Sequence, residues 1–122
     1  MSDLRALAES QRGTEPSKAV ETYKKAVLEA RWKLAHTIRH HGDVYAEQNQ
    51  IQLALPCYEE ALTIYRGHPG APPLDIANAI RANAVATDRP ELWAEARSLY
   101  ERCGVEEGVH ECDLRLRQMR GS

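Results

Sequence analysis

The apolar residues of this chain recur at three- and four-residue steps along most of its length, and no stretch sustains the two-residue alternation of a half-buried strand. A step of this size is the signature of an amphipathic α-helix. The pattern therefore predicts an all-α protein. The seven expected helices lie at about 2–11, from the N-cap Thr14 to a turn near 31–33, at about 33–48, at about 51–66, after the Pro72-Pro73 pair, from Asp88 to Gly104, and at about 105–120.

Three segments of the chain share one pattern at a spacing of 35 residues. They begin at Ala19, Ala54 and Arg89, and read AVETYKKAVLEA, ALPCYEEALTIY and RPELWAEARSLY. Small residues let two helices approach closely, and an aromatic ring fills the space beside that contact, so the pattern predicts stacked helical hairpins. The equivalent positions are Tyr23, Tyr58 and Trp93; Ala26, Ala61 and Ala96; and Ala30, Tyr65 and Tyr100.

A second pair of segments precedes two of these helices at an offset of 42 residues. The segment LAHTIRHHGDVYAEQ begins at Leu34 and aligns with IANAIRANAVATD, which begins at Ile76. We interpret the two segments as the first helices of successive hairpins. The alignment equates Ile38 with Ile80, Arg39 with Arg81, and Gly42 with Ala84.

The spacing of Gly42, Tyr45, Ala54, Tyr58 and Ala61 resembles that of the tetratricopeptide repeat. The stretches ALP and HPGAPPLDIANAI are similar to the 42-residue variant found in kinesin light chains and many bacterial proteins. The resemblance covers nearly the whole chain and is strongest in residues 34–66. It implies a single domain, 1–122, folded as a right-handed α-solenoid of about three hairpins. The expected boundaries are about 2–31, 33–67 and 73–103 for the repeats and 105–120 for a capping helix.

The last predicted helix carries one narrow apolar stripe, as expected of a helix that covers the open end of a stack. The acidic residues near its start and the arginines near its end suit the helix dipole. At the preceding helix, Asp88 and Glu91 have the spacing of a capping box. The stripe consists of Val105, Val109, Cys112, Leu116 and Met119.

The boundary between the first two repeats carries two interpretations. The stretch LEARWKLAH contains neither Gly nor Pro, so local propensity permits one long helix there. Stacked repeats instead require a turn near Arg31 to Lys33, and we favour that turn. A continuous helix would prevent the first repeat from stacking on the second within one chain, and would favour a swapped dimer.

Charge and composition narrow the function. The formal net charge is −2 without any block of like charge, and no apolar run reaches the ~18 residues of a membrane span, so we expect neither nucleic-acid nor membrane partners. The N-terminal MSDLRALAES lacks the apolar core of a secretory signal. Three cysteines without CxxC spacing fit the cytoplasm. No phosphate loop or nucleophile motif is present, so we expect no cofactor and no enzymatic activity.

The stretch AHTIRHHGD concentrates three histidines. His36 and His40 lie four residues apart on one helical face, a spacing that is able to chelate zinc. A zinc site needs a third and usually a fourth ligand, and the nearest candidate is Asp43. Metal binding through this pair is therefore a weak alternative, and we expect no metal site.

The resemblance implies a concave groove lined by the first helix of each hairpin. Stacked repeats would bring Arg39 and Arg81 side by side, and two unpaired guanidiniums favour a carboxylate ligand. Alternatively, each arginine pairs with a neighbour such as Asp43 or Asp75. We expect a non-catalytic interaction module that binds an acidic peptide or protein segment; a structural protein that homo-oligomerises through its repeats is the alternative. The expected groove residues are His36, Arg39, His40, Asp43, Asn78 and Arg81.

Overall fold

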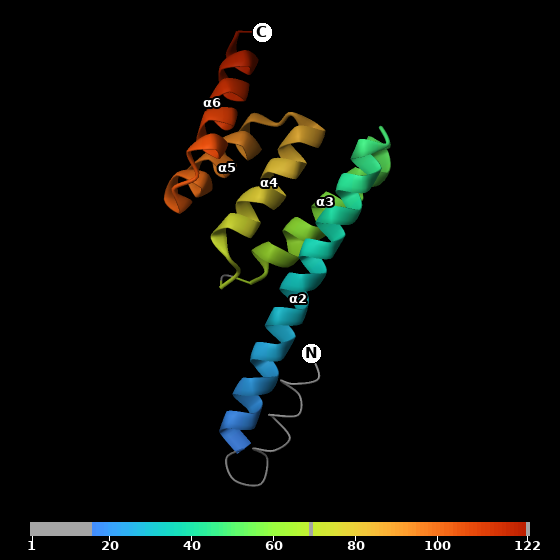
Figure 1. Cartoon of the computed structure of the whole chain (residues 1–122), viewed down its shortest axis with the longest axis vertical. Helices are drawn as coiled ribbons and strands as arrows, with labels where there is room; N and C mark the ends of the chain where they lie inside the picture. Colours follow the sequence, from blue (N-terminus) through green and yellow to red (C-terminus); the bar gives the residue numbers. More distant parts are fainter. Residues whose placement is uncertain (1–15, 69, 122) are drawn as a thin grey trace. The chain divides into compact units, whose positions relative to one another are not determined.

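The computed structural model of the chain describes residues 16–68 and 70–121. In these residues it contains five helices and no strand (Figure 1), which confirms the all-α prediction for this part of the chain. The expected first helix at 2–11 and the N-cap Thr14 lie outside the described residues. The helices are α2 (Pro16–Glu47), α3 (Ile51–Arg66), α4 (Pro73–Thr87), α5 (Pro90–Cys103) and α6 (Glu106–Arg120).

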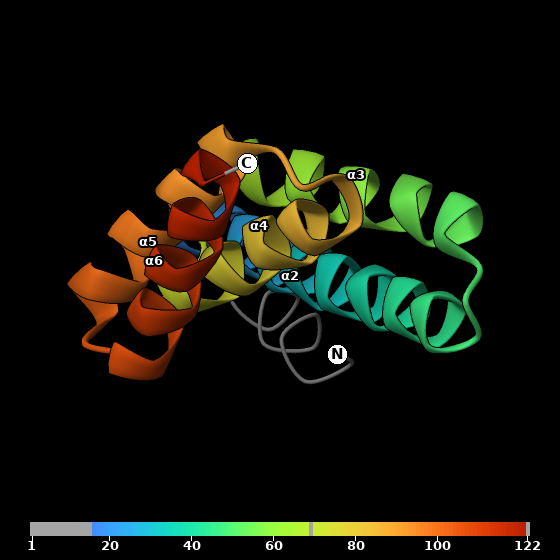
Figure 2. The ribbon, with the colours of Figure 1, turned by 90° about the horizontal axis from the view of Figure 1, so that it is seen from above.

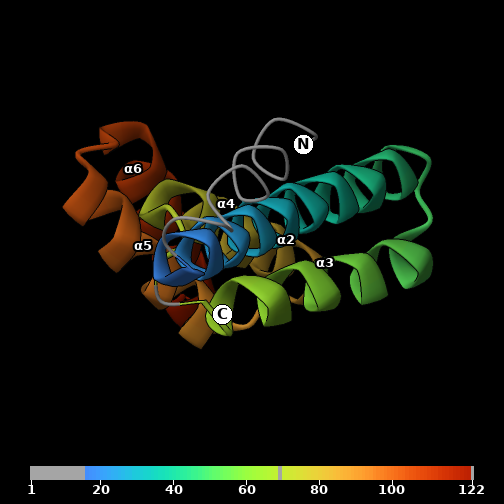
Figure 3. The same ribbon diagram turned by 90° about the horizontal axis from the view of Figure 1, so that it is seen from below.

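The contacts of the chain divide it into two compact units, residues 1–34 and 35–122. In the second unit each helix packs on the next: α3 on α4, α4 on α5, and α5 on α6. Figure 2 shows α4 between α3 and the pair α5 and α6, and Figure 3 shows the short connection that reverses the chain between α2 and α3. No helix in the described part combines the length and apolar content that crossing a bilayer requires.

The 35-residue pattern agrees with burial in two of its three copies. On α3 and α5 all three equivalent positions are buried: the aromatic residue, the small residue three positions later, and the tyrosine four positions after that. On α2, the equivalent residues Tyr23, Ala26 and Ala30 are only half-buried. The pattern therefore identifies the core positions of α3 and α5. These positions are Tyr58, Ala61 and Tyr65 on α3, and Trp93, Ala96 and Tyr100 on α5.

The helix predicted at 105–120 is present as α6, and its apolar stripe faces the core of the second unit. Cys112 is fully buried, and the other four residues of the stripe pack against the cluster around Trp93. Arg115 donates to Asp88 at 2.6 Å and lies 5.5 Å above the Trp93 ring. This helix therefore covers α5 through both apolar and charged contacts.

The turn expected near Arg31 to Lys33 is wrong, because α2 continues without interruption from Pro16 to Glu47. The stretch between Ala19 and His41 contains no Gly or Pro, and Ala, Leu, Glu, Lys and Arg, which favour the helix, make up more than half of it. Local propensity therefore outweighs the turn that stacked repeats would require, and the long helix that was the alternative is the one observed.

The capping box expected at Asp88 is also wrong. Asp88 has a positive φ of 52° and ends α4, where its N–H donates to the Ala84 carbonyl at 2.7 Å. The N-cap of α5 is Arg89, which makes no side-chain capping bond and instead donates to Glu91. With only Asp88 and Arg89 between the two helices, the left-handed conformation at Asp88 reverses the chain and leaves its carboxylate to Arg115.

The contact between α5 and α6 yields a stability prediction. A Cβ added at Gly108 would overlap the ring of Tyr100. Gly→Ala inside a helix ordinarily stabilises by up to ~1 kcal/mol, but forcing a methyl group into a filled space costs ~1–3 kcal/mol. We expect Gly108→Ala to destabilise the chain by about that second amount, measured by urea unfolding.

The matched control is Gly67→Ala. Gly67 has an ordinary φ of −75°, and the nearest atom to an added Cβ lies 3.5 Å away. The Gly67→Ala chain should therefore be as stable as the wild type or slightly more stable. A Gly108→Ala chain as stable as the wild type would contradict the described packing of α6 on α5.

Candidate functional site

A groove of about 330 Å³ runs between the C-terminal part of α2 and α4, with α3 contributing to its wall. All of its lining residues belong to the second compact unit. Its side chains come mainly from the two helices that the 42-residue alignment equates. They are Arg39, Asp43, Ala46, Glu47, Tyr58, Asn78, Arg81, Ala82 and Val85.

Four of the six expected groove residues line this groove: Arg39, Asp43, Asn78 and Arg81. His36 and His40 do not line it; both are exposed on α2. An α-helix advances 100° per residue, so His36 shares the face of Arg39 and Asp43 but precedes Arg39, where the lining residues of α2 begin, whereas His40 lies to one side of that face.

Hydrogen bonds link Arg39, Asp43 and Tyr58 in the groove. Arg39 Nη1 lies 3.3 Å from Asp43 Oδ2, and the Tyr58 hydroxyl donates to Asp43 Oδ1 at 2.7 Å. The Arg39 side chain is only 16% exposed, and its Nε is buried without a hydrogen-bond partner in the described part of the chain. Burial and the bond to Asp43 raise the pKa of Tyr58 well above its usual value, so its proton stays in place. Arg39 is therefore a packed side chain.

Asn78 and Arg81 are held by residues later in the chain. The Tyr100 hydroxyl donates to Asn78 Oδ1 at 2.7 Å. Arg81 donates through Nε and Nη2 to the two carboxylate oxygens of Glu111, at 2.5 Å and 2.7 Å. This bidentate pair raises the pKa of Arg81 and lowers that of Glu111. Both groups therefore remain charged over the whole neutral range.

The expectation of two unpaired guanidiniums is wrong, because Arg39 binds Asp43 and Arg81 binds Glu111. Among the lining residues, two arginines face two carboxylates, Asp43 and Glu47, so the groove is balanced in charge. The alternative, in which each arginine pairs with a residue of the same chain, named Asp43, and Asp43 is the partner of Arg39. It missed Glu111, because nothing in the sequence places that edge of α6 opposite Arg81.

Sequence reasoning also missed the two tyrosine hydroxyls that hold Asp43 and Asn78, and the apolar contribution of Val85. Tyr58 and Tyr100 were assigned to the core from their spacing, and their rings do lie there. The spacing of a tyrosine in a helix places its ring but carries no information on the partner of its hydroxyl. The one sequence signal for the apolar side chain in the groove was helical spacing: Val85 lies four residues after Arg81 and therefore shares its face of α4.

The three histidines at residues 36, 40 and 41 make two different kinds of contact. The Nε2 atoms of His36 and His40 lie 3.2 Å apart, so one ring donates a hydrogen bond and the other accepts it. His41 packs instead against the ring of Tyr45. Within residues 16–68 and 70–121, no group of three or more His, Cys, Asp or Glu side chains is arranged to hold a metal ion.

Comparison with known proteins gives no relative for this chain: no family model matches it, and neither do the curated proteins or the solved structures.

The hydroxyl that positions Asn78 yields a pH prediction. Burial raises the pKa of Tyr100 to about 12, above the value of about 10 for an exposed tyrosine. Between these values the unfolded chain loses the proton while the folded chain keeps it. This contribution to stability is therefore fully present below about pH 10 and is lost as the pH rises towards 12.

We expect Tyr100→Phe to be less stable at neutral pH by about 0.5–1.5 kcal/mol, because the bond to Asn78 is lost. Above pH 10 its stability should fall less steeply than that of the wild type. Urea unfolding at stepped pH measures both effects. Equal alkaline slopes in the two proteins would show that Tyr100 does not retain its proton in the folded chain.

Proposed function

We propose that this chain is a non-catalytic binding module that takes a peptide segment of a partner protein into the groove. In this proposal the helices form a short right-handed α-solenoid of tetratricopeptide-like hairpins, and the groove is its concave face. The observation that carries the proposal is the composition of the groove: an exposed apolar side chain, Val85, lies beside polar side chains that are already held in place.

Pre-positioned polar groups support binding, because the ligand does not have to order them. Asp43 is held by Tyr58 and Asn78 by Tyr100, so each presents its remaining hydrogen-bonding atoms in one orientation. Ala46 and Ala82 are small and add apolar surface between these polar groups. An extended peptide offers a matching alternation of backbone polar groups and side chains.

The shifted pKa values support binding over proton transfer. A general acid or base works best with a pKa near the operating pH. Here the pKa values of Tyr58, Tyr100 and Arg81 are raised and that of Glu111 is lowered, so each moves away from neutrality. We also propose a cytoplasmic location, which three free cysteines favour.

The partner segment that we propose is acidic, and it reaches Arg81 by replacing Glu111. The Arg81 and Glu111 side chains are 43% and 36% exposed, so water reaches the pair and its net contribution to stability is below ~1 kcal/mol. A ligand carboxylate is able to form the same two hydrogen bonds with the guanidinium. Arg39, in contrast, stays with Asp43 as part of the wall.

The first test blocks the groove. A random-peptide display library is selected against the wild-type chain, and the selected peptides are measured against Val85→Arg. Val85 is 49% exposed, so this change should shift stability by less than ~0.5 kcal/mol while the long side chain fills the groove. We expect binding to weaken at least about ten-fold, which is about 1.4 kcal/mol.

The matched control is Leu114→Arg on α6, because Leu114 is 48% exposed and does not line the groove. It adds the same charge and should bind the peptides as the wild type does. Peptides that bind Val85→Arg as well as the wild type, or a library that yields no binder, would contradict the proposed function.

The second test concerns the acidic ligand. Glu111→Gln removes the internal carboxylate that binds Arg81. A ligand carboxylate then no longer has to displace it, so acidic peptides from the selection should bind up to about ten-fold more tightly. Asp113→Asn is the control: Asp113 lies on the same helix and pairs with Arg97, outside the groove. An equal gain in both variants would reflect net charge alone and would remove Arg81 from the proposal.

A further inference from the structure

Four polar side chains of α2 meet beside the groove. The Nε2 atoms of His36 and His40 lie 3.2 Å apart, and Arg39 Nη2 lies 3.5 Å from the same nitrogen of His40. The other ring nitrogen of His40, Nδ1, lies 3.7 Å from Asp43 Oδ2. All four residues belong to the second compact unit, and both histidines are exposed. The nitrogens of Arg39 and His36 therefore converge on one nitrogen of an exposed ring.

The contacts around His40 indicate which of its ring nitrogens carries the proton. A neutral histidine has one N–H donor and one acceptor nitrogen. The Asp43 carboxylate accepts hydrogen bonds and does not donate them, so it favours the proton on the nitrogen that it faces, Nδ1. Nε2 is then the acceptor for the N–H groups of Arg39 and His36. In its neutral form, His40 thus supplies the acceptor between two donors.

Protonation of both rings turns this acceptor into a donor. An imidazolium carries a proton on each nitrogen, so the two Nε2 atoms and Arg39 Nη2 all become donors. Two imidazolium groups whose nitrogens lie 3.2 Å apart also repel each other. An anion between them offsets the repulsion and supplies an acceptor. Anion binding and proton uptake by His36 and His40 therefore favour each other.

We infer that His36, Arg39 and His40 form a binding site for a phosphoryl group, and that binding is coupled to protonation of the two histidines. The two imidazoliums add two positive charges, which match a phosphate dianion, and its three oxygens match the three donors. Arg39 donates through Nη2 while Nη1 stays with Asp43. Of the three site residues, only Arg39 lines the groove, so the inference does not rest on the proposed function.

The charges around the site favour an anion over a metal cation. Two histidines four residues apart on a helix are able to chelate zinc. Here, however, a cation on His40 Nε2 would lie close to the Arg39 guanidinium, which repels it. Asp43 faces the Tyr58 hydroxyl, Arg39 Nη1 and the far side of the His40 ring. Its negative charge is therefore balanced by Arg39, and the imidazoliums set the net charge of the site.

The tyrosines of α3 and α5 that interact with this cluster stay neutral. The Tyr58 hydroxyl donates to Asp43, and Tyr65 and Tyr100 interact with the charge of Arg39. Burial raises the pKa of all three, so each keeps its proton throughout the range in which histidine titrates. A change in anion binding between about pH 5.5 and 7.5 therefore reports the histidines.

Sulfate is the first probe, because it keeps its two charges over the range in which histidine titrates. The isotope-labelled full chain is titrated with sulfate at low ionic strength, and the imidazole signals are followed by NMR. We expect saturable shifts of the His36 and His40 signals. The dissociation constant should be at least about ten-fold lower at about pH 5.5 than at about pH 7.5, because an ordinary histidine is about nine-tenths protonated at the first and about one-tenth at the second.

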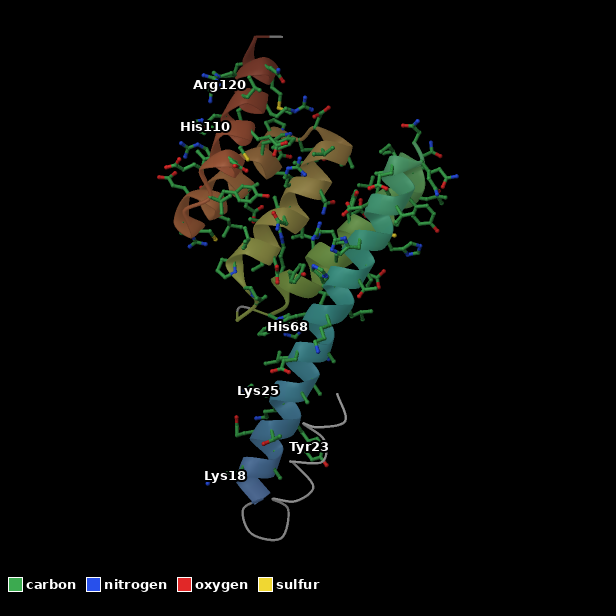
Figure 4. All side chains as sticks on the ribbon, viewed as in Figure 1. Lys18, Tyr23, Lys25, His68, His110 and Arg120 are labelled. Carbon is green, nitrogen blue, oxygen red and sulfur yellow. The ribbon has the colours of Figure 1, made fainter. Side chains whose placement is uncertain are left out.

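The other three histidines of the chain are internal references. His41 packs against the ring of Tyr45. Figure 4 labels the other two, His68 between α3 and α4 and His110 on α6. Their signals should shift far less than those of His36 and His40. Equal shifts of all five histidines would reflect general screening by the salt and would overturn the inference.

A variant and its matched control test the site residues. His40→Gln should weaken sulfate binding at about pH 5.5 at least about ten-fold, because the charged donor at the centre of the site is lost. His41→Gln removes another exposed histidine of the same helix and should bind sulfate as the wild type does. Both side chains are exposed, so neither change should unfold the chain. Equal binding by His40→Gln and the wild type would exclude the site.

Two further probes distinguish the sources of a phosphoryl group. The first is inorganic phosphate. The second is an acidic peptide from the display selection in which phosphoserine replaces one acidic residue, and this arm alone rests on the proposed function. Tighter binding of the phosphopeptide than of its parent and of phosphate assigns the site to a phosphorylated partner segment. Saturable phosphate binding without that gain assigns it to free phosphate.

The inference and the proposed function fail in different ways. If neither sulfate nor phosphate gives saturable shifts of the His36 and His40 signals, the inference is overturned, whatever the groove binds. Zinc that shifts these two signals where both anions fail would show a cation site in its place. Anion binding at this site together with peptides that ignore Val85→Arg would leave the inference standing and remove the proposed function.

Discussion

Within residues 35–122, a tyrosine ring packed against a glycine joins α2 to α3, and a second such contact joins α5 to α6. The ring of Tyr58 lies where a Cβ on Gly42 would be, and the ring of Tyr100 fills the equivalent space beside Gly108. The hydroxyl of each tyrosine donates to a residue that lines the groove: Tyr58 holds Asp43, and Tyr100 holds Asn78. One side chain thus joins two helices through its apolar part and orders the candidate site through its polar end.

The polar groups of the groove keep one protonation state and have partners within the chain. Burial raises the pKa values of the two tyrosines, so both hydroxyls stay protonated and remain donors to their partners. The arginines face carboxylates of the same chain, so no guanidinium in the groove is bare. A ligand therefore has to exchange with an internal partner at Arg81, the more exposed of the two.

The long helix α2 reflects a conflict between two levels of organisation. Residues 19–30 carry the pattern that is buried on α3 and α5, which favours a hairpin. The residues that follow favour the helix strongly and offer no Gly or Pro at which a hairpin could turn. The chain resolves the conflict in favour of the helix, and Val27 and Leu34 are about half exposed on it.

The sequence by itself determined the helical class, the helices α3 and α6 almost to the residue, and the core positions of α3 and α5, because periodicity and small–aromatic spacing are local properties. It also led to Arg39, Asp43, Asn78 and Arg81, because equivalent positions in aligned helices share a face. Only the tertiary structure decided the partners Glu111 and Asp88, which lie 30 and 27 residues from the arginines that they bind. The physical reason is that an ion pair depends on how helices meet, and no spacing within one helix encodes which edge of another will face it.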